Sequence, residues 1–332
     1  MNQKPNPNVL DTVGIFNTTD DTELIVNVSP HITSGDSTRT IMRDVLIALA
    51  PAAVAGCVLF GLRALAVMLV TVGFAVLSEW GFQKLCKVPT TVCDCSAIVT
   101  GLILGMNLPV GIPLWQAAIG SIIAIVIVKQ MFGGIGQNFA NPAATARVIM
   151  LLAFAQPMTN FTTKVGGIVG QNVDALSGAT ALARLHGGEP IPSYVQLLLG
   201  NQTGSLGETC TIALLVGLAY LLIRGVITWH APAAFVVTVA AFSAVLGGDP
   251  LAEILSGGVM IAAVFMITDY TTTPMTSLGR LIFGFGCGIL TVLIRFFGNY
   301  SEGVSFSILL MNILTPYINK WTAPKPVGGV EA

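Results

Sequence analysis

Apolar residues occur along this chain in long runs that are broken only by short polar stretches. A helix needs roughly 20 apolar residues to cross the hydrocarbon core of a bilayer. The pattern therefore predicts an all-α, polytopic membrane protein with about ten transmembrane helices, five before a central polar stretch and five after it. The predicted spans are residues 44–62, 64–82, 96–108, 114–131, 143–155, 208–227, 231–246, 251–268, 279–297 and 303–320.

Composition supports the membrane assignment. Of the 332 residues, 54% are hydrophobic and 9% are charged, whereas a soluble domain has about 25% charged residues. So few charges could not cover a surface that faces water, and lipid is the expected neighbour. The net charge of −1 gives no reason to expect nucleic-acid binding. The polar residues 1–40 lack a basic segment leading into a short apolar one, which predicts no cleavable signal peptide.

Basic residues predict the orientation of the spans, because cytoplasmic loops carry an excess of Lys and Arg. If the N-terminus lies on side one, that side receives eleven basic residues and the opposite side receives four. Both termini are therefore expected in the cytoplasm, and an even number of spans agrees. The loop after the fifth span is expected outside.

The two halves share an irregular third span. The span at residues 96–108 is short and leads into the stretch N-L-P-V-G-I-P. The span at residues 251–268 contains Ser256-Gly257-Gly258 and leads into T-D-Y-T-T-T-P. Paired broken helices predict two inverted five-helix repeats, although Gly and Pro are also simply commoner in membrane helices. The expected organisation is a cytoplasmic segment, a first repeat, an external loop, a second repeat and a cytoplasmic tail, over residues 1–43, 44–157, 158–207, 208–320 and 321–332.

The external loop contains D-A-L-S-G-A-T, from Asp174 to Thr180. Ser177 or Thr180 could simply cap a short helix. The full D-x-x-S-G-A-T pattern, however, resembles the acceptor motif of ApbE-type flavin transferases, which join FMN through its phosphate to the last Thr or Ser. Thr180 would supply the hydroxyl, Asp174 and Ser177 would complete the motif, and the small Gly178 and Ala179 would leave the transferase room.

A second candidate site lies between the fourth and fifth spans, in F-G-G-I-G-Q-N-F-A-N-P. Asn141 before Pro142 is typical of a helix start, but that does not explain the crowded glycines. Gly133 and Gly134 would let backbone approach a flat ligand. Asn138 and Asn141 could pair with the polar edge of a ring.

Three acidic residues lie within or beside apolar spans, where a carboxylate is costly and is a functional candidate by default. For Asp44 and Glu79 we expect an interfacial carboxylate paired with Arg43 or Arg280, or a cap. Asp269, beside the broken helix, is a possible contact for an ion or a flavin. Cys93 and Cys95 flank Asp94 at a spacing that fits no zinc or iron–sulfur site, and the scattered histidines form no triad.

Taken together, these stretches resemble one family, that of RnfD of the Rnf complex and its paralogue NqrB of the sodium-pumping NADH:quinone reductase. The resemblance covers nearly the whole chain, and the short polar N-terminal region favours RnfD. It is carried by V-S-P-H-I, G-G-I-G-Q-N-F-A-N-P-A-A-T-A-R, D-A-L-S-G-A-T-A-L, T-D-Y-T-T-T-P-M-T-S-L-G-R-L-I-F-G and E-G-V-S-F-S-I-L-L-M-N-I-L-T-P-Y-I, which begin at residues 28, 133, 174, 268 and 302.

The resemblance implies two cofactors: covalent FMN on Thr180 and a non-covalent riboflavin on the cytoplasmic side, where Asn138 and Asn141 match family positions. It also implies an electron-relaying subunit of a ferredoxin:NAD oxidoreductase in a prokaryotic cytoplasmic membrane, coupled to Na⁺ or H⁺ transport. Its partners would be the A, B, C, E and G proteins of the Rnf complex, above all the FMN-bearing RnfG, and an ApbE-type transferase. The alternatives are an NqrB-type protein and, less favoured, a secondary transporter or channel.

Overall fold

The computed structural model describes residues 37–161, 180–200, 202–208, 210–298 and 303–324. They belong to one compact unit, Asp36–Ala332, and the separate unit Met1–Gly35 lies outside the described residues. Every regular element in the described ranges is a helix. The predicted all-α class is therefore confirmed.

A helix is present at each of the ten predicted segments. In the first half these are α1 (Thr38–Phe60), α2 (Leu62–Leu85), α3 (Ser96–Met106), α4 (Leu114–Ile122) continued by η3 (Ile123–Lys129) and η4 (Gln130–Phe132), and α5 (Pro142–Ala153). In the second half they are α9 (Thr211–Ile223), α10 (His230–Val245), α11 (Pro250–Leu255), α12 (Val259–Ile261) continued by η5 (Ala262–Met266), α13 (Ser277–Phe297) and α14 (Val304–Thr322). The short helices η2 (Val92–Asp94), α6 (Ala155–Thr159), α7 (Ala181–His186) and α8 (Tyr194–Leu199) lie between them.

Polar side chains determine where several helices begin. The Ser37 hydroxyl accepts a hydrogen bond from the Thr40 N–H at the start of α1. The Thr276 hydroxyl accepts from the Gly279 N–H at the start of α13. Both satisfy backbone donors that have no partner inside their helix. The first span therefore begins at Thr38, before the predicted Asp44.

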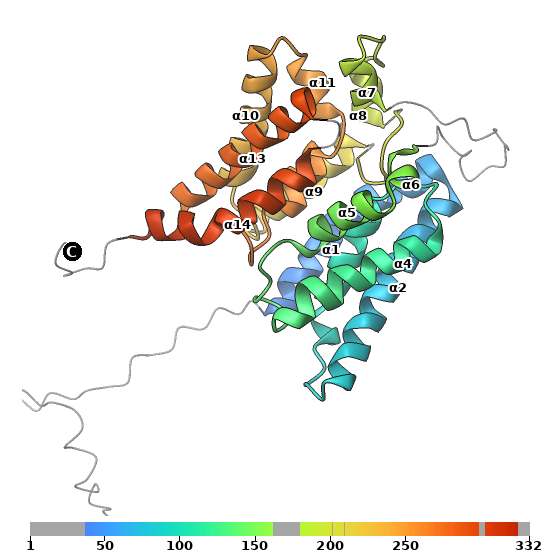
Figure 1. Cartoon of the computed structure of the whole chain (residues 1–332), viewed down its shortest axis with the longest axis vertical. Helices are drawn as coiled ribbons and strands as arrows, with labels where there is room; N and C mark the ends of the chain where they lie inside the picture. The colour runs from blue at the N-terminus through green and yellow to red at the C-terminus, as the bar shows by residue number, and fades with distance from the viewer. Residues whose placement is uncertain (1–36, 162–179, 201, 209, 299–302, 325–332) are drawn as a thin grey trace, which may run out of the picture. The chain divides into compact units, whose positions relative to one another are not determined.

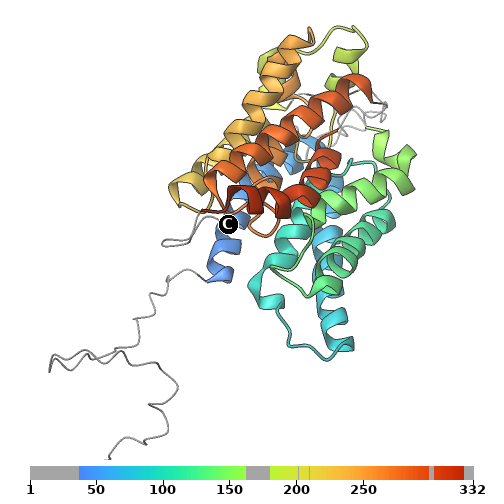
Figure 2. The same ribbon diagram turned by 60° about the vertical axis from the view of Figure 1, so that its left-hand side comes forward.

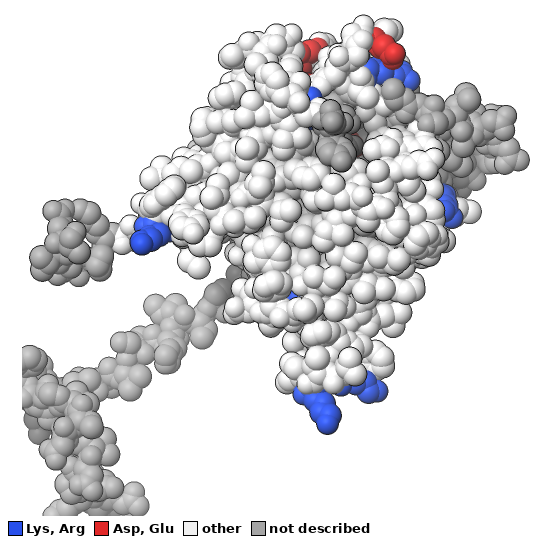
Figure 3. All heavy atoms as spheres, in the orientation of Figure 1, with Lys and Arg blue, Asp and Glu red and all other residues white. Residues whose placement is uncertain are grey.

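The chain is a membrane-embedded protein. Four of its described helices are long and apolar enough to cross a membrane: α1, α2, α13 and the continuous helix Leu114–Phe132. The described α3, α5, α9 and α10 are shorter apolar helices. Large apolar side chains on α1, α2 and α13 point outward, and on the face shown in Figure 3 the charged side chains lie at the edges of a broad uncharged surface. Such a surface suits lipid rather than water.

The third segment of each half is irregular, as predicted. In the second half, Ser256, Gly257 and Gly258 separate α11 from α12, and Gly257 has a φ of 67° that other residues rarely adopt. In the first half, α3 has only 11 residues. The residues at its end accept backbone hydrogen bonds from the segment just before α9. The Leu206 N–H donates to Leu108 O at 3.1 Å, and the Gly207 N–H donates to Met106 O at 2.6 Å.

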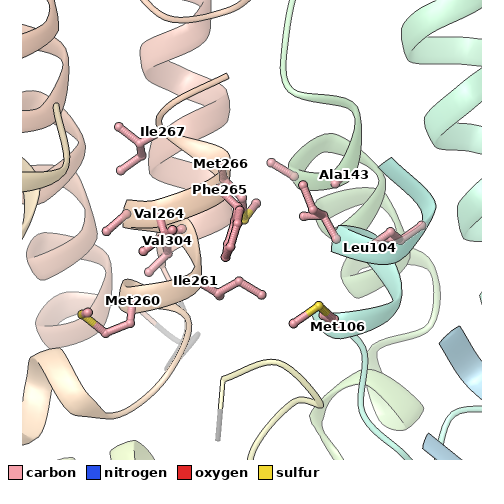
Figure 4. Packing of buried hydrophobic residues seen from close by; sticks show 14 of the residues in the cluster. Leu104, Met106, Ala143, Met260, Ile261, Val264, Phe265, Met266, Ile267 and Val304 are labelled. Atoms are coloured by element: carbon pink, nitrogen blue, oxygen red, sulfur yellow. The ribbon is translucent and has the colours of Figure 1, made fainter. Parts of the chain in front are cut away.

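The apolar core lies where the irregular segments meet. Figures 1 and 2 show α10, α13 and α14 side by side in the second half, and α2, α3 and α4 together in the first. Between them, Figure 4 shows Leu104 and Met106 of α3 and Ala143 of α5 facing Ile261, Phe265 and Met266. All of these side chains are buried. The contact holds the broken segments in place and positions the cavity described next.

Candidate functional site

A cavity of about 90 Å³, open to solvent, lies at the end of the helices where α5 begins. It is lined by Met42, Val45, Ser96, Val99, Thr100, Ile103, Lys129, Ile135, Asn138, Asn141, Pro142, Ala143, Leu221, Ile227, Phe265, Thr268, Asp269, Tyr270 and Thr271. The predicted site residues Asn138, Asn141 and Asp269 therefore line the same cavity. Mostly apolar walls with a few polar groups are typical of small-molecule sites.

The two asparagines have different environments. Asn141 caps α5, because its Oδ1 accepts from the N–H groups of Ala143 and Ala144, both at 3.1 Å. Its Nδ2 donates to Met266 O at 3.3 Å, so the amide oxygen and one of the two amide N–H groups have partners. Asn138 Nδ2 donates to Thr271 Oγ1 at 3.4 Å, but its buried Oδ1 accepts no hydrogen bond among the described residues. Asn138, which lines the cavity, thus has a buried acceptor without a partner among the described residues.

The paired glycines form a turn rather than a wall. Gly133 and Gly134 have φ values of 118° and 92°. Their N–H groups bond to Gln130 O and Lys129 O, at 3.1 and 3.0 Å, and so end the helix. Neither lines the cavity, whereas Ile135 and Asn138 just beyond them do. The glycines therefore turn the chain so that the following residues reach the cavity. Direct contact between these glycines and a ligand stays a prediction.

Asp269 is held by threonines, without a basic partner among the described residues. Its carboxylate accepts from Thr271 N–H at 3.3 Å, Thr271 Oγ1 at 3.1 Å and Thr272 Oγ1 at 3.2 Å. Desolvation raises the pKa of Asp269, and these hydrogen bonds lower the pKa only in part. Arg280 is engaged elsewhere, since it donates to Pro274 O and Thr228 Oγ1.

The cavity wall includes a buried lysine whose role the sequence did not reveal. Lys129 ends η3, a π-helix, and its side chain is 3% exposed. Its Nζ lies 2.8 Å from Glu79 Oε1 and 2.6 Å from Ser96 Oγ. The expected pairing of Glu79 with Arg43 or Arg280 at the interface is therefore wrong. Glu79 is fully buried and pairs with a lysine 50 residues later in the chain.

Two further acidic residues, Asp94 and Asp44, accept hydrogen bonds from neighbouring groups. Asp94 lies two residues before α3, and its Oδ1 accepts from the N–H of Ser96 at 2.8 Å and from Ser96 Oγ at 2.6 Å. Cys93 and Cys95 beside it are free cysteines. Asp44 of α1 pairs with Arg224 at 3.1 Å rather than with the expected Arg43 or Arg280.

Thr180 begins α7, and its hydroxyl accepts from the Ala183 N–H at 3.1 Å. The interpretation of Thr180 as a helix cap is thus confirmed, and a capping hydroxyl still carries a free proton and lone pair. Thr180 is 7% exposed. The remaining motif residues, Asp174, Ser177, Gly178 and Ala179, lie outside the described residues.

Helix α7 is held against the broken segment of the second half. His186 Nε2 lies 2.6 Å from Glu253 Oε1, and Glu253 Oε2 lies 2.7 Å from Arg295 Nη1. α7 thus contacts α11, at the start of the eighth segment, whereas Phe265 and residues 268–271, at its end, line the cavity. Thr180 and the cavity therefore lie toward opposite ends of this segment.

Three basic residues that enter the orientation count lie in the interior. Lys129 and Arg147 on side one are 2% and 6% exposed, and Arg147 Nη2 lies 3.0 Å from Glu208 Oε1 beside Gly258. Arg295 on the other side is also buried. Removing two residues from the eleven and one from the four leaves nine against three. Basic residues are therefore still in excess on side one.

Comparison with known proteins identifies the chain's relatives. The model of the NQR2, RnfD, RnfE family matches residues 25–328. The D component of a Na⁺-translocating ferredoxin:NAD⁺ oxidoreductase complex from Acetobacterium woodii is 46% identical, over 92% of this chain and 95% of that protein. The D component of a proton-translocating ferredoxin:NAD⁺ oxidoreductase complex from Clostridium ljungdahlii is 41% identical over 91% and 96%. The D component of an ion-translocating oxidoreductase complex from Halorhodospira halophila is 36% identical over 90% and 94%.

Proposed function

The chain belongs to the NQR2, RnfD, RnfE family, and we propose that it is the flavin-carrying membrane subunit of an Rnf-type ferredoxin:NAD oxidoreductase. In this role it relays electrons between flavins on the two sides of a prokaryotic cytoplasmic membrane. The complex couples that transfer to movement of Na⁺ or H⁺. Relatives of similar identity are named for different ions, so the identity of the coupling ion is not part of the proposal.

The observation that carries the proposal is the cavity that brings Asn138, Asn141 and Asp269 together. Residues from both halves of the chain meet there beside an apolar wall. The free Oδ1 of Asn138 suits the N–H of a flavin's polar edge. Val99, Ile103 and Phe265 offer an apolar surface to its ring. These residues fit riboflavin, whose ring supplies one- and two-electron chemistry.

The second flavin is FMN, joined through its phosphate to Thr180. The support is the complete D-x-x-S-G-A-T motif and the position of Thr180 at a helix start. The attachment needs a hydroxyl, which Thr180 provides. Docking of α7 against α11 would then keep the flavin at a defined place on the protein.

The topology follows from the same arrangement. We infer ten membrane-crossing segments, two inverted five-helix repeats, cytoplasmic termini and an external loop carrying Thr180. The nine-to-three excess of basic residues supports the orientation. Flavins toward opposite ends of the eighth segment would allow electron transfer across the bilayer. The chain would exchange these electrons with the FMN-bearing RnfG, and the A, B, C and E proteins would complete the complex.

Flavin content of the purified chain tests this function. Protein expressed with an ApbE-type transferase is expected to hold one covalent flavin and one flavin that acid extracts. Asn138→Leu should lower the extractable flavin and leave the covalent flavin unchanged, since it removes the free acceptor. Phe139→Leu, an exposed neighbour that does not line the cavity, is the control. A colourless wild-type protein would contradict the proposal and favour a transporter.

A further inference from the structure

Lys129 connects the cavity to a half-buried carboxylate through hydrogen bonds. Its Nζ donates to Ser96 Oγ at 2.6 Å, and Ser96 Oγ donates to Asp94 Oδ1 at 2.6 Å. Lys129 and Ser96 both line the cavity. Asp94 lies in the turn between α2 and α3 and is partly exposed. Three side chains thus form an unbroken hydrogen-bonded chain from the protein surface to the cavity.

The ammonium of Lys129 has one donor to spare. An ammonium group has three N–H donors. Two of them are used by Glu79 Oε1 and Ser96 Oγ. The third has no acceptor in the part of the chain that the structure describes. Since Lys129 lines the cavity, that proton is available to a ligand there.

A purely structural ion pair does not account for this arrangement. Replacing a buried ion pair by apolar residues is often neutral or stabilising, and ionisable groups inside membrane proteins commonly mark proton or ion pathways. Glu79 alone would neutralise the charge of Lys129. Ser96 nevertheless also accepts a hydrogen bond from the ammonium and donates one to Asp94. Lys129 also ends the π-helix η3, a type of helix that is frequent at functional sites.

We propose that Asp94, Ser96 and Lys129 form a proton relay from the protein surface to the ligand of the cavity. The inference rests on the proposed function only in taking that ligand to be a flavin. When a one-electron donor reduces the ligand, Lys129 Nζ gives one proton to it. The Asp94 carboxylate accepts a proton from hydronium at the surface and passes it to Ser96 Oγ while the Ser96 hydroxyl gives its own proton to neutral Lys129, so Asp94 and Ser96 end in the protonation states in which they began. One electron and one proton therefore enter the cavity together.

Lys129 is faced by acidic groups from several elements. Glu79 faces it from α2, and Asp94 is linked to it from η2 through Ser96. Asp269 lies on the wall of the same cavity, contributed by the second half. Glu79 accepts also from Gln130 Nε2 at 2.7 Å, and its buried Oε2 has no partner among the described residues. Glu79 thus holds Lys129 in place and stabilises its charged form between transfers.

The test follows the rate of flavin reduction in full-length protein that carries Thr180→Ala, so that the cavity flavin is the one observed. Dithionite is the electron donor, and rates are measured from about pH 6 to about pH 9, a range that brackets neutrality. Asp94→Asn and Ser96→Ala should each slow reduction by about tenfold or more, as expected for a lost general acid. Added imidazolium, a small proton donor, should restore much of the rate.

Lys129→Arg separates proton transfer from simple charge. Arginine keeps the positive charge but does not release its proton, so this variant should be as slow as Lys129→Met. Asp249→Asn is the control, because the Asp249 carboxylate also accepts from backbone N–H at the start of a helix, α11, as that of Asp94 does at α3, and Asp249 does not line the cavity. Asparagine keeps a side-chain oxygen that can accept these hydrogen bonds, so both variants should fold.

The outcomes separate the two proposals. If the Thr180→Ala protein yields no extractable flavin, the cavity ligand and the relay are both contradicted. If flavin is present but Asp94→Asn, Ser96→Ala and Lys129→Arg reduce at the wild-type rate, the relay is wrong and the cavity flavin stands. Slow variants that imidazolium does not restore would also overturn the relay, because misplacement of the flavin would then explain the loss.

Discussion

Arg295 Nη1 lies 2.7 Å from Glu253 Oε2, and both side chains are fully buried. Glu253 also accepts from His186 of α7, so one carboxylate joins α13, α11 and the short helix that begins at Thr180. The segment proposed to carry the covalent flavin is therefore attached to the core through a buried ion pair.

Breaking this pair should destabilise the protein. Arg295→Leu leaves the buried Glu253 carboxylate with only His186 as a partner, and removing one member of a buried pair typically costs about 3–5 kcal/mol. Thermal unfolding of the detergent-solubilised protein measures the loss. Arg224→Leu is the comparison, because the Arg224 side chain is half exposed beside Asp44 and Asp44 keeps the hydrogen bond from Tyr220, so the loss should be smaller. Equal losses in the two variants would contradict the structural role given to Arg295.

Asp269 should make stability depend on pH. Burial raises its pKa in the folded protein, so the folded state binds a proton more tightly than the unfolded state does. Stability from this group is then highest at low pH and falls as pH rises through the folded-state pKa. Asp269→Asn, which keeps the acceptor for Thr271, should raise the unfolding temperature at neutral pH and change it little at pH about 4, near the ordinary Asp pKa. A lower unfolding temperature at neutral pH would contradict this prediction.

The amount of covalently attached flavin should depend on the Thr180 hydroxyl and on the Asp174 carboxylate. Thr180→Ser keeps a hydroxyl and should retain some in-gel flavin fluorescence. Asp174→Ala should reduce the fluorescence more than it reduces the amount of folded protein, since Asp174 would be read by the transferase. The comparison is fluorescence per unit of protein in the same gel. Undiminished fluorescence in Asp174→Ala would remove Asp174 from the motif.

Topology can be tested with single cysteines introduced into a chain that lacks its native six. A cysteine at Gln171 should react with a membrane-impermeant reagent in intact cells, and a cysteine at Lys325 should react only after lysis. The excess of basic residues on one side is the physical reason. The reverse pattern would overturn both the orientation and the external position of Thr180.

Helix positions are predictable from this sequence because long apolar runs and helix caps are local signals. Asn141 before Pro142 and Thr180 before Ala181 both begin helices, as their positions suggest. The ion pairs Glu79–Lys129, Arg147–Glu208 and Glu253–Arg295 are not predictable in this way, since their partners are 50, 61 and 42 residues apart. Those contacts depend on how helices pack, which periodicity does not encode. For the same reason, the sequence does not reveal that Lys129 lines the cavity, and Lys129 is counted among the basic residues that predict the orientation.

The central claim is that Thr180 carries FMN, and the intact mass of the chain tests it most directly. Wild-type protein expressed with its flavin transferase should be heavier than the unmodified chain by the mass of one esterified FMN, and the increment should be on the peptide that contains Thr180. Protein expressed without the transferase, and the Thr180→Ala variant expressed with it, should show no increment. An unmodified mass for the wild-type chain in the presence of active transferase, or an increment that persists in Thr180→Ala, would contradict the account.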